Sequence, residues 1–309
     1  MNAESPRKNK LAFNTIVFPN TSSENDAVLL AKSIRKNGGN LSEFQIRMFQ
    51  PAISKEVSLD AKRHLKELDV DIIQFKIKNE KLTFPFMSEA IAMAEAEKLG
   101  LNDSEQIVWL ARNSVIIREP VELLLREKEQ LRYRPVHHIL IGSRYNEDKD
   151  AFWNLVYQSC RIDDDQIFPM RTHIDNIEIR PYFNAGCLVT RPESGIFQKY
   201  LNNFQREYLR DDFKRFYQKN ELYMIFIHQA ILSGTIISTV QKDMMVELPS
   251  SYNYPVHLHN DDRTENRPRV LDDIVTFRHE GFHQESDWMD KMPASRGLKK
   301  WLSDSLVHR

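Results

Sequence analysis

Four histidines late in the chain have side chains that could bind a metal. His257 and His259 stand in VHLHN, and His279 and His283 stand in RHEGFH. Four imidazoles could hold Zn²⁺ in tetrahedral geometry if the two segments converge. Nothing in the sequence brings the segments together, and Gly281 weakens a helical spacing of the second pair. Zinc therefore remains an alternative, and we expect no metal.

A second candidate for chemistry is the pair His228 and Gln229 in IHQAILSG, an apolar segment with helical spacing. His228 could act as a general base, because the ordinary histidine pKa of about 6.5 is close to neutral pH. A histidine on an apolar helix also packs readily in a core. The three aspartates of RIDDDQ cannot all face one ion in an extended chain, so they predict a solvated turn or a helix N-cap.

Two strand-like segments end in residues that could meet a ligand. The segment IVWLARNSVIIREP, residues 107–120, predicts a buried strand, a turn and a second short strand. Its turn, ARNS, could be only a polar connection. In YFNAGCLV, Gly186 would let a ligand approach the backbone, and Asn184 could bind sugar hydroxyls. A glycine bulge packed against the core is the competing interpretation.

Composition describes an ordinary globular chain and excludes several classes of protein. The 309 residues are 41% hydrophobic and 28% charged, with a net charge of −1. This balance does not favour binding to nucleic acid. Cys160 and Cys187 lack metal-binding spacing and fit a reducing compartment, and no run is long and apolar enough for a membrane span. We expect a cytoplasmic protein whose residues 1–10 form a flexible tail.

The first third of the chain alternates strand and helix patterns. LAFNTIVFP predicts a strand, and NDAVLLAKSIRKNGG predicts a helix with Asn25 or Asp26 as its N-cap. The pattern repeats to residue 110. This order predicts an α/β fold with a mostly parallel sheet flanked by helices, in one compact domain over residues 11–309. Ligands of such sheets bind beyond the carboxyl ends of the strands, where residues 110–120 would lie.

The second half is less regular. VHHILIGS, YFNAGCLVTRP and RVLDDIVTFRH read as strands, and residues 195–220 read as one long helix. LREKEQLRYRP shows mixed charge at helical intervals and reads as an exposed face. Residues 221–234 predict another helix, and further helices are expected at the carboxyl end.

The order of several short motifs carries a family resemblance. SIRKNGG, IVWLxxNSVIIREP, RPYFNAGCLVTRP, HQAILSG, LPSSYNYP and FRHEG follow one another between residues 13 and 283. This order resembles nucleotide-sugar-dependent glycosyltransferases of the GT-A fold, and is similar to the glycogenin-like and galactosyltransferase-like families. The resemblance implies residues 11–120 as a nucleotide-binding half and residues 121–309 as an acceptor half with the C-terminal helices.

The resemblance also implies an Asp-x-Asp pair at the end of the strand VWL. Residues two apart on a strand face the same side, so two carboxylates could hold one Mg²⁺ or Mn²⁺ against the donor diphosphate. Here the two positions are Ala111 and Asn113, so the motif is degenerate. Glu89 stands where such families often place a basic residue, and its charge would repel a diphosphate.

Site residues follow from matching the family's motifs to this sequence. His228 and Gln229 match an Asp-Gln pair near the acceptor and are the predicted catalytic residues. The predicted donor-binding residues are Ala111, Arg112, Asn113, Asn184, Ala185, Gly186, His279 and Gly281. In the family, a histidine placed like His279 joins the metal or contacts the diphosphate.

Two functions therefore compete ahead of the zinc enzyme. One is metal-independent glycosyl transfer from a nucleotide sugar to an unknown acceptor, with no cofactor, in which a basic side chain replaces the cation. The candidates are Arg112, Lys291, Arg296 and Lys299. Strand alternation would turn Arg112 to the opposite face unless the backbone turns there. The other is a degenerate protein that binds a sugar nucleotide or a partner, either a second copy or an active homologue.

Overall fold

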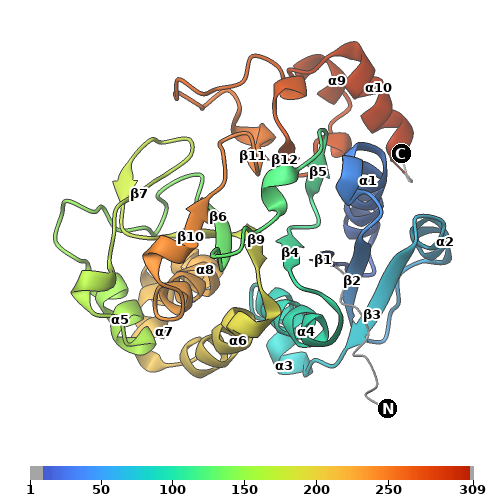
Figure 1. Ribbon diagram of the computed structural model, residues 1–309. Coiled ribbons are helices and arrows are strands. Elements are labelled where there is room, and N and C mark those ends of the chain that lie inside the picture. Colours follow the sequence, from blue (N-terminus) through green and yellow to red (C-terminus); the bar gives the residue numbers. More distant parts are fainter. Residues whose placement is uncertain (1–9, 307–309) are drawn as a thin grey trace.

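The computed structural model describes residues 10–306 and centres on a seven-stranded sheet. The predicted tail, residues 1–10, lies almost wholly outside the described residues. The strand order is β10-β6-β9-β4-β1-β2-β3 (Figure 1). The strands are β1 (Ala12–Ile16), β2 (Gln45–Pro51), β3 (Val70–Phe75), β4 (Ile107–Leu110), β6 (Leu131–Pro135), β9 (Phe183–Thr190) and β10 (Met245–Glu247).

Most neighbouring strands of this sheet run parallel. Strands β4, β1, β2 and β3 form one parallel set, β10 pairs with β6 in parallel, and β9 runs antiparallel to both β4 and β6. The predicted α/β fold in a single domain is confirmed. The parallel strands end at one edge, and β4 ends there at Leu110.

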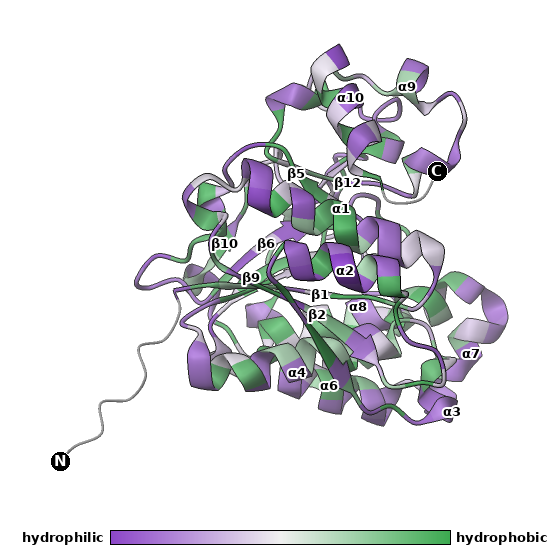
Figure 2. Cartoon of the chain, turned by 90° about the vertical axis from the view of Figure 1, so that its right-hand side faces the viewer, coloured by the Kyte–Doolittle hydropathy of each residue, from purple (hydrophilic) through white to green (hydrophobic). Residues whose placement is uncertain are grey.

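Helices cover both faces of the sheet (Figure 2). On one face, α1 (Thr21–Asn37) and α2 (Leu59–Glu67) pack on an apolar cluster that includes Phe13, Leu30 and Leu65. The other face carries α4 (Met87–Asp103), α6 (Ile196–Glu207) and α8 (Glu221–Ile237). The remaining helices are α3 (Asn79–Leu82), α5 (Ala151–Cys160), α7 (Asp211–Lys219), α9 (Trp288–Lys291) and α10 (Arg296–Ser305).

Helix α1 begins earlier than the sequence suggested. The N-cap is Asn20, whose side chain accepts a hydrogen bond from the Ser23 amide at 3.0 Å. The prediction of Asn25 or Asp26 as N-cap was wrong, because the chain enters the helix soon after Pro19. Asp26 is therefore a buried carboxylate within the helix, near the carboxyl edge of the sheet.

Parts of the second half also differ from the sequence prediction. VHHILIGS is not a strand: β6 ends at Pro135, and residues 136–143 form turns. The long helix is divided into α6 and α7. The buried Glu207 carboxylate accepts hydrogen bonds from Arg206 Nε and Arg210 Nη1, and this pairing holds the chain at the break.

A small second sheet brings two distant motifs together. It contains β11 (Tyr254–Pro255), β12 (Thr276–Arg278) and β5 (Ser114–Ile116), in that order. β12 runs antiparallel to β5, with Arg278 opposite Ser114. The late FRHEG motif consequently lies directly beside the ARNS turn. Strands β7 (Met170–Arg171) and β8 (Glu178–Ile179) form a separate antiparallel pair.

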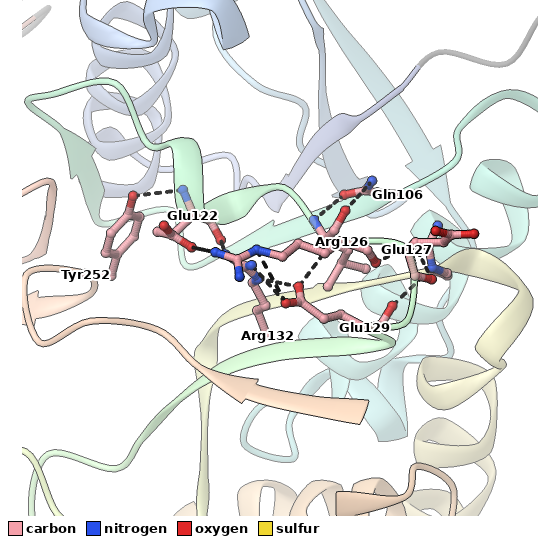
Figure 3. Close-up of polar contacts among 9 residues, drawn as sticks. Gln106, Glu122, Arg126, Glu127, Glu129, Arg132 and Tyr252 are labelled. Carbon is pink, nitrogen blue, oxygen red and sulfur yellow. Dashed lines mark hydrogen bonds and ion pairs between the residues drawn. The ribbon is translucent and has the colours of Figure 1, made fainter. Parts of the chain in front are cut away.

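A buried arginine fixes the loop that leads into β6 (Figure 3). Arg132 Nε donates to Glu129 Oε2 at 2.7 Å, and its Nη1 donates to the Glu122 carbonyl at 2.7 Å. Gln106 bonds the backbone of Leu125 through both amide atoms. The charged segment LREKEQLRYRP thus contains a buried strand and is not an exposed face. Its arginines can be buried because Arg132 pairs with Glu129 and Arg134 pairs with Glu247.

We expect Tyr252→Phe to lower the free energy of unfolding by about 1 kcal/mol, because the buried Tyr252 hydroxyl accepts the Glu122 amide at 3.1 Å in this network. Urea denaturation measures the change. Tyr157→Phe is the matched control, since the buried Tyr157 hydroxyl has no hydrogen-bond partner among the described residues. Equal losses in both variants would contradict the assignment.

Within residues 10–306, no helix is long and apolar enough to cross a bilayer.

Candidate functional site

A cavity of about 200 Å³ opens at the carboxyl edge of β4 and β1. Helices α4, α6 and α8 form one wall, and the ARNS turn and the end of β12 form the other. Seven of the ten predicted site residues line it. They are Ala111, Arg112, Asn113, Ala185, Gly186, His228 and Gln229.

Arg112 enters this cavity because the chain turns immediately after β4. The Ser114 amide donates to the Ala111 carbonyl at 3.0 Å, so strand alternation stops before Arg112. Its Nη1 lies 3.8 Å from Glu89 Oε1, and its Nε lies 3.9 Å from Asp26 Oδ2. Arg112 Nε is buried without a hydrogen-bond partner among the described residues. A charged donor is thus left partly uncommitted in the cavity.

Arg278 is a second arginine in the same cavity. Its Nη2 lies 3.9 Å from Glu280 Oε1 at the exposed rim, and its buried Nε has no hydrogen-bond partner within residues 10–306. A Cβ placed on Gly186 would lie 2.9 Å from Arg278 Nη1. Glycine at position 186 therefore makes room for the Arg278 guanidinium.

The two positions of the implied Asp-x-Asp pair do not fit a divalent cation. Ala111 has no ligand atom. The Asn113 side-chain amide donates to the His279 carbonyl, and the His279 amide donates to the Asn113 carbonyl at 3.0 Å. Asn113 thus ties the ARNS turn to the late histidine, and this pair of positions offers no carboxylate for a cation.

A different group has the composition of a metal site. One ligand atom each from Asp26, His279 and His283 lies within 4.8 Å of the others, the one such group in residues 10–306. The Gly281 amide donates to His279 Nδ1 at 3.1 Å. In the neutral ring this leaves the proton on Nε2, which faces Asp26 Oδ1 at 4.0 Å. The tautomer favours a histidine that faces the Asp26 carboxylate over one that binds a cation.

The four late histidines do not converge. His279 and His283 lie beside Asp26, whereas His259 Nδ1 pairs with the Tyr254 hydroxyl at 2.9 Å. His257 is likewise outside the group around Asp26. The zinc site of four imidazoles was therefore wrong, because the segments carrying the two pairs face different partners.

Glu89 lies in the cavity wall beside Arg112. Burial raises the pKa of its carboxyl, and the positive charge of Arg112 acts in the opposite direction. A protonated Glu89 would not repel a diphosphate. Protonation of Glu89 would thus remove the negative charge that the sequence suggested as unfavourable for a diphosphate.

A comparison with family models identifies the family of the chain. Residues 14–229 match the Rhodobacterales glycosyltransferase domain. The chain belongs to this family. No curated protein matches it.

Solved structures support the same fold. The galactosyltransferase LgtC, in complex with donor and acceptor sugar analogs, is 15% identical with a TM-score of 0.52, over 96% of this chain and 97% of that chain. An active-site mutant of LgtC gives 14% identity and a TM-score of 0.53 with the same coverage. The bifunctional glycosyltransferase WbbM is 11% identical with a TM-score of 0.52, over all of this chain and 53% of that chain. At these identities the likeness shows the GT-A-like fold alone.

In this glycosyltransferase domain, His228 is buried in the wall of the cavity. Its ring stacks on Phe86 with centroids 4.0 Å apart. Burial, followed by the charge of Arg278, lowers the pKa of His228 to about 3, so the ring is neutral and weakly basic at pH 7. Gln229 Oε1 accepts the Ala185 amide at 3.0 Å and fixes the edge of β9. Both side chains shape the cavity in this arrangement.

Three predicted donor-binding residues lie outside the cavity lining. Asn184 is buried, and its Oδ1 accepts the Gly186 amide at 2.9 Å, so it supports the glycine from behind. His279 is fully buried behind Asn113. Gly281 has φ +78° and supplies the left-handed turn that lets its amide reach the His279 ring.

The three basic residues proposed from the C-terminal segment lie away from the cavity lining. Lys291 pairs with Glu285 Oε2 at 3.0 Å and Asp287 Oδ1 at 3.1 Å on the surface. Arg296 and Lys299 lie on α10, which packs against α1. Of the basic residues considered from the sequence, Arg112 alone lines the cavity.

Several cavity residues were missed from the sequence. Arg278 directly precedes His279 in the FRHEG motif, and this position is the signal that could have suggested it. Tyr200 of α6 and Phe86, which directly precedes α4, come from distant segments and carried no signal. Phe86 has φ +60°, a strained conformation for a non-glycine residue, and its ring meets His228 there.

Proposed function

We propose that this glycosyltransferase domain binds a nucleoside-diphosphate sugar in the cavity and transfers the sugar without a divalent cation. The observation that carries the proposal is the pair Arg112 and Arg278. Both have a buried Nε without a hydrogen-bond partner in the described part of the chain, and both line the cavity beside the degenerate Asp-x-Asp positions. Unpaired buried donors are costly, and an anionic ligand would satisfy them.

The arginines would act on the leaving group. During transfer, the bond between the sugar C1 and the β-phosphate oxygen breaks, and its electron pair stays on the phosphate. The acceptor hydroxyl oxygen bonds C1, and its proton passes to the released diphosphate. Guanidinium groups bind phosphate oxygens through charge-assisted hydrogen bonds and stabilise the charge that develops there.

The size of the cavity restricts what it holds. A pocket for a whole drug-sized ligand usually measures about 300–1,000 Å³. The volume of about 200 Å³ is sufficient for only part of a nucleotide sugar. We place the diphosphate and sugar within it and the nucleoside toward residues 11–120, with residues 121–309 forming the acceptor side.

Calorimetric titration with UDP, GDP and a panel of nucleotide sugars tests the proposal, in EDTA and in Mn²⁺. We expect at least one nucleotide to bind. Its affinities in EDTA and in Mn²⁺ should agree within about twofold, because the Asp-x-Asp positions offer no carboxylate to a cation. Release of nucleoside diphosphate from the matching donor, with EDTA present, tests transfer. Binding that requires Mn²⁺, or the absence of any nucleotide binding, would overturn the proposal.

A degenerate binding protein is the alternative. The neutral His228 favours it, because a ring with a pKa of about 3 is a poor general base at neutral pH. In this alternative a nucleotide binds without turnover, and the domain acts on a second copy or an active homologue. The free cysteines Cys160 and Cys187 are compatible with a reducing compartment, and we place either function in the cytoplasm.

A further inference from the structure

A second, larger cavity of about 590 Å³ is lined by three arginines and two glutamates. It lies among β6, the end of β10, the loop between β7 and β8, and residues 263–266. Its charged and imidazole side chains are Arg134, Arg171, His173, Arg263, Glu247 and Glu265. We call this the basic cavity.

Arg134 forms the buried floor of the basic cavity. Its Nη1 donates to Glu247 Oε1 at 2.7 Å and to the Leu248 carbonyl at 2.6 Å. Its Nε is buried and has no hydrogen-bond partner among the described residues. Glu247 therefore offsets one positive charge but leaves part of the guanidinium unsatisfied.

His173 is a second unsatisfied group in the lining. Its side chain is more than nine-tenths buried, and no described residue bonds its Nδ1. Its amide donates to the Val136 carbonyl at 3.0 Å, which fixes the residue in place. The exposed Arg171 and Arg263 stand at the rim. A buried, unpaired imidazole and arginine below two rim arginines make a site for an anion.

His137 is a third unsatisfied group near the basic cavity, although it lines neither this cavity nor the donor cavity. Neither of its ring nitrogens has a hydrogen-bond partner in the described chain, and its ring centroid lies 5.8 Å from that of His173. Burial first, and then the charges of His173, Arg278 and Arg134, hold the pKa of His137 well below its usual value. His137 is therefore a neutral group within electrostatic reach of both Arg134 and Arg278 of the donor cavity.

We propose that the basic cavity binds the anionic group of a saccharide acceptor, a carboxylate or a phosphate ester. This proposal rests on the proposed glycosyltransferase function. Arg134 and His173 receive the anion, and Arg171 and Arg263 cover it at the rim. A neutral saccharide could accept hydrogen bonds from these donors but would bring no negative charge to the arginines, so charge-assisted hydrogen bonds favour anionic acceptors.

Calorimetric titration with glucuronic acid, glucose 6-phosphate and glucose tests the class of ligand. We expect one or both anionic sugars to bind and glucose to bind at least about tenfold more weakly, because only the anions make charge-assisted hydrogen bonds. Whether the carboxylate or the phosphate binds more tightly identifies the acceptor group. Comparable binding of glucose, or no binding of either anion, would overturn the proposal.

Rim variants locate the binding. The double variant Arg171→Gln with Arg263→Gln should weaken binding of the anionic sugar about fivefold, because two exposed charge interactions are lost. The control, Arg63→Gln with Arg215→Gln, removes two exposed charges from α2 and α7 and should leave affinity unchanged. Equal effects of the two double variants would reject the basic cavity as the site.

A competition arm separates this proposal from the donor proposal. Saturating UDP should leave the anionic sugar bound, since the two ligands occupy different cavities. Displacement by UDP would place the anion in the donor cavity and overturn the inference. If UDP does not bind at all, the donor proposal fails, while the rim variants still test the basic cavity on their own.

Discussion

Replacing Arg112 by glutamine is expected to weaken binding of a nucleoside diphosphate by about ten- to a hundredfold. A hydrogen bond to a charged group contributes roughly 1.5–3 kcal/mol, and each 1.4 kcal/mol is tenfold in affinity. Arg112 reaches into the donor cavity with an unpaired Nε, so glutamine removes both charge and donors. Calorimetry in EDTA measures the change.

Two comparisons make this result specific. Arg118→Gln removes a more exposed charge six residues further along the chain, outside the cavity lining, and should leave affinity unchanged. Arg112→Lys keeps the charge without the planar fork of donors, so its affinity should fall between those of the wild type and Arg112→Gln. Equal affinities of all four proteins would show that the diphosphate lies away from Arg112.

The repeating part of the fold could be predicted from sequence because local signals agree with tertiary structure there. Apolar strands alternate with amphipathic helices through β1, α1, β2, α2 and β3, and short connections leave few topologies. The second half gave weaker signals. Strand β6 reads LRYRP, and a pattern of that kind looks exposed unless its acidic partners, Glu129 and Glu247, are known.

The site was predictable only in part, because its residues come from segments whose contacts are not local. The cavity includes Ala111, Gly186 and His228, as the motif order suggested. The orientation of Arg112 depended on a backbone turn that strand alternation cannot reveal. The sequence suggested Asp26 as a helix cap. It lies at this edge of the sheet because α1 packs beside His279 and His283, a contact that the sequence does not reveal.

Glu89→Gln is expected to strengthen nucleoside-diphosphate binding about tenfold above the pKa of Glu89 and to have little effect below it. Burial raises the pKa of the Glu89 carboxyl. Below that pKa the side chain is neutral in the wild type, and above it a carboxylate faces the bound diphosphate. Wild-type affinity should therefore fall as pH rises through the pKa, and one pKa unit corresponds to about tenfold.

The ratio of the two affinities isolates Glu89, because titration of the ligand's own phosphates is common to both proteins. His228 and His279, with pKa values of about 3 and 4, stay neutral between pH 6 and 9 and contribute nothing to the change. Glu95→Gln removes a carboxylate from the same helix outside the cavity lining and should keep the wild-type pH dependence. A carboxyl whose pKa is raised by folding destabilises the fold increasingly as pH rises from its unfolded pKa to its folded pKa, so Glu89→Gln should also raise the unfolding temperature more above the folded pKa than at acidic pH. A ratio that does not change with pH would mean that Glu89 is not beside the diphosphate, and the donor would then have to lie elsewhere along the edge of the sheet.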